Sequence, residues 1–168
     1  MRSIIINYLI IGLLLFTGCS TKNKSSSKES KALNVKEIKL NAGDYNAIEG
    51  SSEVLWECEW LGGARHDGSV QLVSGSIDIS ETSDVNGRFI VDLNSMKCFD
   101  LTNEGTNKKL IGHLKSDDFF DVANYPEAVL DLISGKNISG NNFEFSGNLT
   151  IKGRTHPIIF TGTVIENK

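Results

Sequence analysis

Residues 142–151 read Asn-Phe-Glu-Phe-Ser-Gly-Asn-Leu-Thr-Ile and carry the most regular hydrophobic alternation in the chain. Apolar or small residues take every second position, at Phe143, Phe145, Gly147, Leu149 and Ile151, with polar residues between them. A period of two is typical of a β-strand that buries one face. The segment therefore predicts a strand whose inward face carries Phe143, Phe145 and Leu149.

Further segments on both sides show the same alternation. One face of the segment 52–60 carries Val54, Trp56, Cys58 and Trp60. After a hairpin turn predicted at Asn86-Gly87, Phe89 and Val91 alternate with polar or outward residues. Strands are also predicted over 67–79, 128–132 and 155–165, with a turn at 152–153, and residues 35–40 form a weaker candidate. Leu110, Ile111 and Leu114 stand at helical spacing, so residues 107–115 predict one short helix.

Many strands joined by short turns, with a single helix, predict an all-β antiparallel domain. Nothing in the chain alternates strands with helices, which excludes a doubly wound α/β fold. A sandwich and a barrel both remain open at this point.

The segment 113–126 is irregular, and it places Phe119, Phe120 and Tyr125 among acidic residues. Such a segment needs an apolar surface to cover, and the mouth of a barrel would provide one. We expect Phe119 and Phe120 to pack there. We expect the nearby carboxylates (Asp117, Asp118 and Asp121) to cap and to solvate the segment, because their spacing does not match a calcium-binding loop.

The N-terminal residues have the layout of an export signal. Residues 1–18 combine one base with a short apolar run and end in Thr17-Gly18, directly before Cys19. This arrangement resembles a bacterial lipoprotein signal, in which Cys19 would be acylated and become the first residue. Residues 19–33 are rich in serine and lysine and predict a flexible tether, followed by a folded domain over 34–168. The expected location is the cell envelope, with a lipid anchor in a bacterial membrane and the domain on the periplasmic side or cell surface.

Charge and motifs exclude several classes of function. A net charge of −4 disfavours binding to nucleic acid. His66, His113 and His156 lie far apart and lack the local spacing of metal ligands, so no metal site is predicted. No nucleophile motif or nucleotide-binding loop is present, so no catalytic residue and no cofactor is predicted. Cys58 and Cys98 are candidates for a disulfide in an exported domain.

The segments together resemble the YceI family of exported bacterial proteins. The resemblance is carried by Ser52-x-Val54-x-Trp56, His66-x-Gly68, residues 89–96 (Phe-Ile-Val-Asp-Leu-Asn-Ser-Met), residues 113–122 (His-Leu-Lys-Ser-Asp-Asp-Phe-Phe-Asp-Val) with Tyr125-Pro126, and residues 147–153 (Gly-Asn-Leu-Thr-Ile-Lys-Gly). It implies an extended eight-stranded antiparallel β-barrel of lipocalin type, with one short helix and an apolar interior.

The same resemblance implies a function without catalysis: binding or transport of a long apolar amphiphile, such as a polyisoprenoid, an isoprenoid quinone or a fatty amide. The expected ligand contacts are Val54, Trp56, Trp60, Phe89, Val91, Phe119, Phe120, Phe143, Phe145 and Leu149. The resemblance also suggests a homodimer. Two alternatives stay open, a structural or stress-related envelope protein whose aromatics fill the barrel, and an enzyme that uses the scattered histidines.

Overall fold

One antiparallel sheet and one helix form most of the described chain. The computed structural model describes residues 4–5, 41–48, 50–59 and 63–166. The strands and the helix are β1 (Ile4–Ile5), β2 (Gly43–Asn46), β3 (Glu53–Glu59), β4 (Arg65–Ile79), β5 (Val85–Cys98), α1 (Glu104–Lys115), β6 (Glu127–Ser139), β7 (Asn142–Ile151), β8 (Arg154–Thr163) and β9 (Ile165–Glu166).

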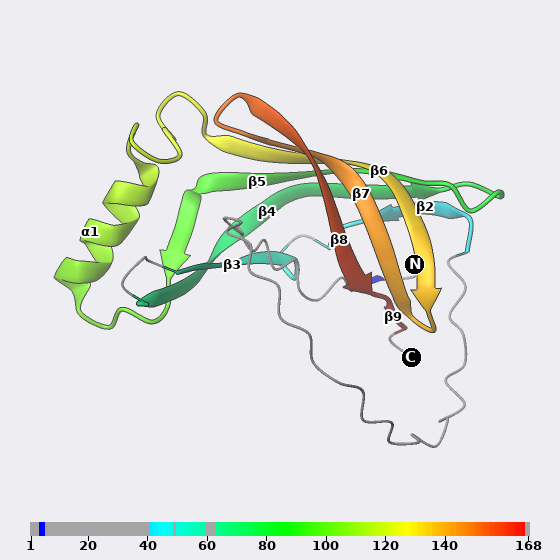
Figure 1. Cartoon of the computed structure of the whole chain (residues 1–168), viewed down its shortest axis with the longest axis horizontal. Coiled ribbons are helices and arrows are strands. Elements are labelled where there is room, and N and C mark those ends of the chain that lie inside the picture. The colour runs from blue at the N-terminus through cyan, green and yellow to red at the C-terminus, as the bar shows by residue number, and fades with distance from the viewer. Residues whose placement is uncertain (1–3, 6–40, 49, 60–62, 167–168) are drawn as a thin grey trace, which may run out of the picture.

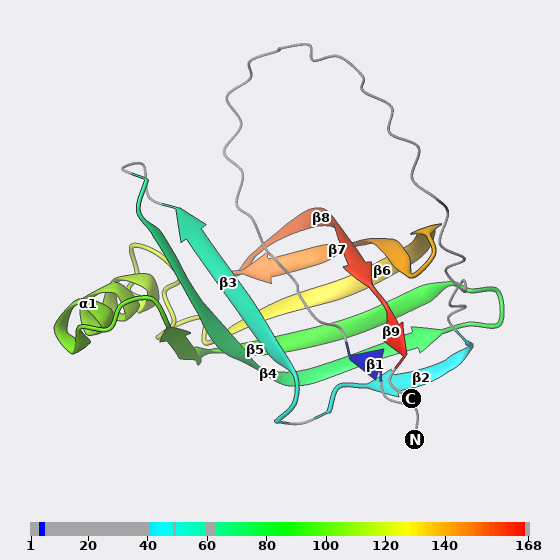
Figure 2. The same cartoon turned by 90° about the horizontal axis from the view of Figure 1, so that it is seen from below.

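Seven of the strands form one sheet in the order β2-β4-β5-β6-β7-β8, with β3 also paired to β4. Every ladder in this sheet is antiparallel. Figures 1 and 2 show the long strands curving into a trough, with α1 at one end. The predicted class, an all-β antiparallel fold of lipocalin type with one short helix, is confirmed.

The rims of the trough are β3 and β8, which face each other across the opening in Figure 2. Among the described strands, no ladder joins these two rims. β3 pairs with β4 over Arg65–Gln71, and β2 pairs with the same edge of β4 over Ser76–Ile79. β2 and β3 therefore share one position in the sheet, so its seven strands occupy six positions. The weaker strand candidate, residues 35–40, lies outside the described residues.

The hairpin between β4 and β5 differs from the prediction. Asn86 and Gly87 are not the turn but lie inside β5, where Gly87 stands opposite Ile77. The chain reverses over Ser80–Asp84, where Ser80 N–H donates to the Asp84 carbonyl oxygen at 2.9 Å and side chains add further hydrogen bonds. Asp84 N–H donates to Ser80 Oγ at 3.0 Å, and Thr82 Oγ1 donates to Asp84 Oδ2 at 2.6 Å. Gly87 serves a different purpose, since a Cβ at this position would lie 2.6 Å from the Ser76 carbonyl oxygen.

Two groups of buried side chains pack inside the trough. We call them the helix-end cluster (Val70, Leu93, Met96, Leu114, Val122 and Ala128) and the turn-end cluster (Ile79, Val85, Leu132, Phe143, Phe145 and Val164). The alternation predicted for β6 and β7 is confirmed, because Leu130, Phe143 and Phe145 are buried at every second position. Each fully buried side chain of this size stabilises the fold by about 1.5–3 kcal/mol.

Helix α1 begins three residues before the predicted start, because Asn103 caps it. The Asn103 side chain accepts a hydrogen bond from Thr106 N–H at 3.1 Å. Such a cap satisfies one of the N–H groups that a first helical turn leaves free. Within the described residues, no helix has both the length and the apolar character needed to cross a membrane. The predicted signal, tether and acylated Cys19 lie outside the described residues except for Ile4–Ile5, which pair with β9.

Candidate ligand cavity

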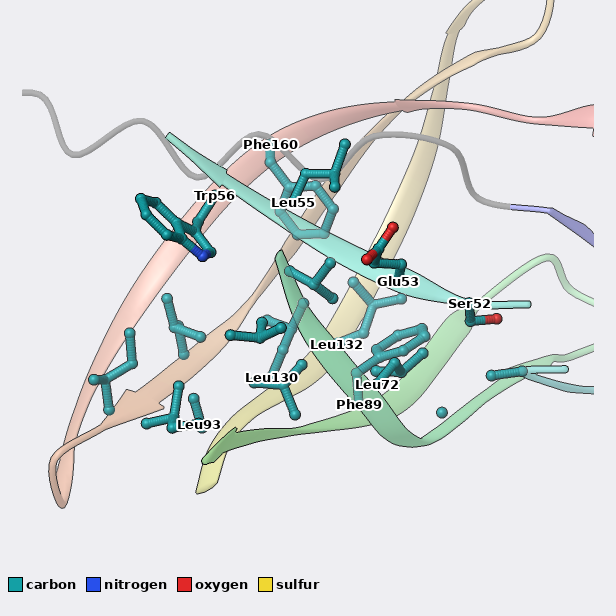
Figure 3. A pocket seen from close by; sticks show the side chains of 18 of the residues that line it. Ser52, Glu53, Leu55, Trp56, Leu72, Phe89, Leu93, Leu130, Leu132 and Phe160 are labelled. Atoms are coloured by element: carbon teal, nitrogen blue, oxygen red, sulfur yellow. The ribbon is translucent and has the colours of Figure 1, made fainter. Parts of the chain in front are cut away.

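An apolar cavity of about 340 Å³ occupies the concave side of the sheet. Its walls come from β2 to β8 and from the segment that follows α1. Figure 3 shows Trp56 near one end of this space and Leu72 with Phe89 toward the other. The cavity thus runs between the two core clusters and includes side chains of both rims.

Most of the residues predicted to contact a ligand line this cavity. They are Val54, Trp56, Phe89, Val91, Phe119, Phe120, Phe145 and Leu149. They meet because inward positions of antiparallel neighbours share one face; for example, Val91 stands opposite Leu72, and Phe89 stands opposite Leu130.

Two predicted contacts are not among the lining residues. Phe143 lies in the turn-end cluster, where it is 5% exposed and stacks on Phe145 with ring centroids 6.1 Å apart. Its ring completes the core beside the cavity, and its assignment as a ligand contact stays a prediction. Trp60 lies outside the described residues.

The sequence prediction missed several lining residues, among them Leu55, Leu72, Leu130, Leu132 and Phe160. Leu130 and Leu132 were recognisable from the alternation along β6. Leu55 was not, because it lies on the face of β3 opposite Trp56 and contributes only because β3 is a rim of the sheet.

The charged groups of the lining are carboxylates. Glu53 and Glu57 belong to it, whereas no lysine, arginine or histidine of the described residues does. Glu57 pairs with Arg65 outside the cavity, and both side chains are largely exposed. The Glu53 carboxylate turns away from Leu72 and Phe89 in Figure 3. The interior itself is therefore apolar and offers no cation to an anionic group.

Trp56 has an unusual environment within this wall. It stands opposite Gly68, and a Cβ at Gly68 would lie 2.5 Å from the indole Cζ2 atom. The indole thus lies directly on the backbone of β4. Its Nε1 atom is buried and has no hydrogen-bond partner in the described part of the chain.

A separate polar cluster forms where β4 begins and β5 ends. His66 Nδ1 lies 2.7 Å from Asp100 Oδ2, and Asp67 N–H donates to Asp100 Oδ1 at 3.1 Å. The Cys98 thiol donates to the same Oδ1 atom at 3.1 Å. The hydrogen bond from His66, helped by those from Cys98 and Asp67, lowers the pKa of Asp100 to about 2. None of these four residues lines the cavity, which favours a structural role in joining β4 to the segment that leads into α1.

Cys58 and Cys98 are separate free thiols in the structure. Cys58 on β3 stands opposite His66, and Cys98 on β5 stands opposite Gly68, so β4 lies between them. Two strand spacings amount to about 10 Å, which exceeds the Cα separation of a disulfide. The candidate disulfide is therefore not formed. Burial raises the pKa of both thiols, and Asp100 adds to this effect.

The other histidines lie on separate elements. His113 is in α1 beside Phe119, with ring centroids 6.2 Å apart. His156 is in β8, where it stands opposite Leu149 of β7. Among the described residues, no three side chains of histidine, cysteine, aspartate or glutamate form a group that could hold a metal ion.

The irregular segment 113–126 closes the helix end of the trough. Leu114 and Val122 are buried there, and Phe119 and Phe120 form an edge-to-face pair with centroids 4.6 Å apart that lines the cavity. Asp121 adopts a positive φ of 52°, and its carbonyl oxygen accepts hydrogen bonds from Asn124 and Tyr125. The two phenylalanines lie at the cavity as predicted.

Comparison with protein families gives one match that covers most of the chain. The model of the YceI-like domain matches residues 45–168. Curated relatives named UPF0312 protein are 35% identical over 83 residues in *Pseudomonas savastanoi* and *Pseudomonas syringae*, covering 49% of this chain and 38% of theirs. A *Pseudomonas putida* UPF0312 protein is 27% identical over 110 residues, covering 66% of this chain and 55% of its own. The chain thus spans about half the length of these relatives, or less.

Among solved structures, the *Burkholderia cenocepacia* protein BcnA has a similar fold. The TM-score is 0.50 at 23% sequence identity, and the match covers 61% of each chain. A *Campylobacter jejuni* YceI protein matches with a TM-score of 0.40 at 16% identity over 79% of this chain and 61% of that one. The likeness to BcnA concerns the fold alone.

Proposed function

The chain belongs to the YceI-like domain family, and we propose that it binds a long apolar amphiphile in the cavity between β3 and β8, without catalysing a reaction on it. The candidates are a polyisoprenoid, an isoprenoid quinone or a fatty amide. The observation that carries this proposal is an apolar cavity of about 340 Å³ on the concave face of the sheet.

The size and the walls of the cavity support a small apolar ligand. Ligand sites usually measure about 300–1,000 Å³ and are lined mostly by apolar side chains. The present cavity is near the lower end of this range, so the remainder of a long chain would lie in the opening between the rims. Removing an aliphatic chain from water contributes about 25 cal/mol per Å² of buried area, which requires no catalytic group.

The alternative of a protein whose own aromatics fill the interior receives less support. Phe145 and Phe160 do pack together, with ring centroids 5.5 Å apart, but both also line open space. An enzymatic function based on the histidines is not favoured, because none of them lines the cavity.

The proposal includes a location at the cell envelope. Its support is the sequence of residues 1–19, in which an apolar run is followed directly by Thr17-Gly18-Cys19. Acyl chains on Cys19 would hold the binding domain next to the membrane that contains such amphiphiles.

The proposal is tested by extracting lipids from the full chain purified from bacteria that express it, followed by mass spectrometry. We expect one class of long-chain compound in near-equimolar amount. Empty protein that also fails to take up a polyprenol, a quinone and a fatty amide would overturn the proposal.

A further inference from the structure

A second hollow, the α1–β5 groove, lies between the helix and the end of β5. It measures about 500 Å³, and its apolar lining comes from Met96, Cys98, Phe99 and Ile111. Met96 also lines the ligand cavity, so the groove lies directly behind the helix end of that cavity. A Cβ at Gly112, another lining residue, would meet no atom within 4 Å, so the groove is open along α1.

An exposed aromatic ring, that of Phe99, borders this groove. Phe99 directly follows β5 and continues its alternation, with Met96 and Cys98 buried and Phe99 52% exposed. Its N–H donates to the Asp67 carbonyl oxygen at 2.8 Å, which fixes the backbone against β4. Single exposed apolar side chains are common on protein surfaces. Phe99 is informative because it stands on a fixed backbone beside a groove with an apolar lining.

The charged side chains of the groove are lysines. Lys97 and Lys108 line it, whereas no aspartate or glutamate of the described residues does. Lys108 pairs with Glu104 at 2.6 Å, but both side chains are highly exposed, and such surface pairs contribute little. Lys97 forms no ion pair in the described part of the chain. In a chain whose net charge is −4, the groove is thus a local surface that attracts anionic groups.

The edge of β5 beside the groove does not offer its backbone to a peptide strand. Side chains of α1 already occupy its carbonyl groups: Asn107 Nδ2 donates to the Cys98 carbonyl oxygen at 3.0 Å, and Lys115 Nζ donates to that of Asn94 at 2.8 Å. A peptide that added a strand to a sheet edge would need such groups. The groove instead combines apolar surface, an exposed aromatic ring and ammonium groups, which is typical of surfaces that lie in a membrane interface.

We propose that the α1–β5 groove docks the domain on an anionic lipid bilayer, with Phe99 in the head-group region and Lys97 and Lys108 beside lipid phosphates. Because α1 lies at one end of the trough (Figure 1), docking brings the helix end of the cavity, which Leu114 and Phe119 line, next to the membrane. This inference goes beyond the proposed function and does not depend on which ligand the cavity binds.

The test places an indole at the groove and asks whether it enters a bilayer. The full chain with Phe99→Trp is mixed with vesicles whose brominated acyl chains quench indole fluorescence, and bound protein is isolated by flotation. The vesicles contain phosphatidylcholine alone or with about one third phosphatidylglycerol, which is anionic. We expect the anionic vesicles to quench about half or more of the emission that Phe99→Trp adds to the unsubstituted chain. The matched control Ile138→Trp, at a position 55% exposed near the turn between β6 and β7, should add emission that neither vesicle quenches.

Removing the lysines tests the electrostatic part of the docking. Lys97→Gln with Lys108→Gln, in the Phe99→Trp chain, should weaken this quenching interaction with anionic vesicles about tenfold, whereas Lys136→Gln at the far end of β6 should not change it. Salt of about 1 M, which shortens the screening length to about 3 Å, should also remove the quenching. Unquenched emission on anionic vesicles, equal quenching on both vesicles, or full quenching in the double lysine variant would overturn the inference. Each of these results would leave the proposed ligand cavity untouched.

Discussion

The indole of Trp56 occupies the space in which a side chain at Gly68 would stand, with Cζ2 2.5 Å from the position of a Cβ. The Lys97 carbonyl oxygen would be even closer to that Cβ, so the backbone of β5 closes the other side. Gly68 therefore allows β3, β4 and β5 to bring Trp56 against the sheet at the cavity wall.

Gly68→Ala should lower the free energy of unfolding by about 1–3 kcal/mol, because neither the indole nor the Lys97 carbonyl can move away freely. Urea denaturation measures this effect. Gly112→Ala is the matched control, since a Cβ there meets nothing within 4 Å in the exposed helix α1. That control should raise the free energy of unfolding by about 0.5–1 kcal/mol. Equal stability of Gly68→Ala and the unsubstituted chain would show that Trp56 does not rest on β4.

Asp100 should make stability depend on pH in the acid range. Its folded-state pKa of about 2 lies below the ordinary value of 3.8, so between these values the unfolded chain binds more protons than the folded one. The contribution of Asp100 is thus fully present above about pH 4 and is lost as the pH falls through 2. Asp100→Asn should flatten this part of a stability profile obtained by chemical denaturation. Asp118→Asn should not flatten it, because the Asp118 carboxylate accepts no hydrogen bond in the described structure. Identical slopes in all three proteins would contradict the role of the His66–Asp100 contact.

Cys58 and Cys98 should react slowly with iodoacetamide at neutral pH, because burial raises the pKa of each thiol and keeps it protonated. Peptide mass spectrometry follows the two residues separately. Methyl dodecanoate should slow the reaction of Cys58, which lines the cavity, and leave that of Cys98 unchanged. Equal protection of both, or a Cys58–Cys98 disulfide after mild oxidation, would contradict the structure.

Cys19 is expected to be the acylated N-terminal residue of the protein made in bacteria. The N-terminal peptide of the purified chain should begin at residue 19 and carry fatty acyl groups in its mass spectrum. Cys19→Ser should remove these groups and leave the protein unattached to membranes after cell fractionation. An unmodified Cys19 within an uncleaved N-terminus would refute the proposed anchor.

The period of two in the sequence was sufficient to predict the fold class and part of the cavity wall. In β7 it identified Phe145 and Leu149 correctly, because alternate side chains of one strand share a face. Phe143 has the same pattern but lies in the core. The pattern could not distinguish it from the residues that line the cavity, because that distinction depends on how β8 and Val164 pack over the end of the strand.

Features that depend on neighbouring strands were beyond the sequence pattern. Asn86-Gly87 has the composition of a hairpin turn, yet Gly87 is needed inside β5 for its close approach to Ser76. Cys58 and Cys98 could be paired or kept apart only once β4 was placed between them. The unused donor of Trp56 likewise becomes visible only when the apolar neighbours of the indole are known.

The central claim is that the cavity between β3 and β8 is the binding site, and it is tested most directly by filling it. Leu72 lines the cavity, and its neighbour Val73 is 50% exposed outside it, so Leu72→Trp and Val73→Trp add the same bulk on different sides of the sheet. Native mass spectrometry of the full chain measures uptake of methyl dodecanoate and of an isoprenoid quinone by each protein. We predict that Leu72→Trp loses at least tenfold in affinity for both ligands while Val73→Trp binds like the unsubstituted chain. Undiminished binding by a folded Leu72→Trp variant would contradict the account.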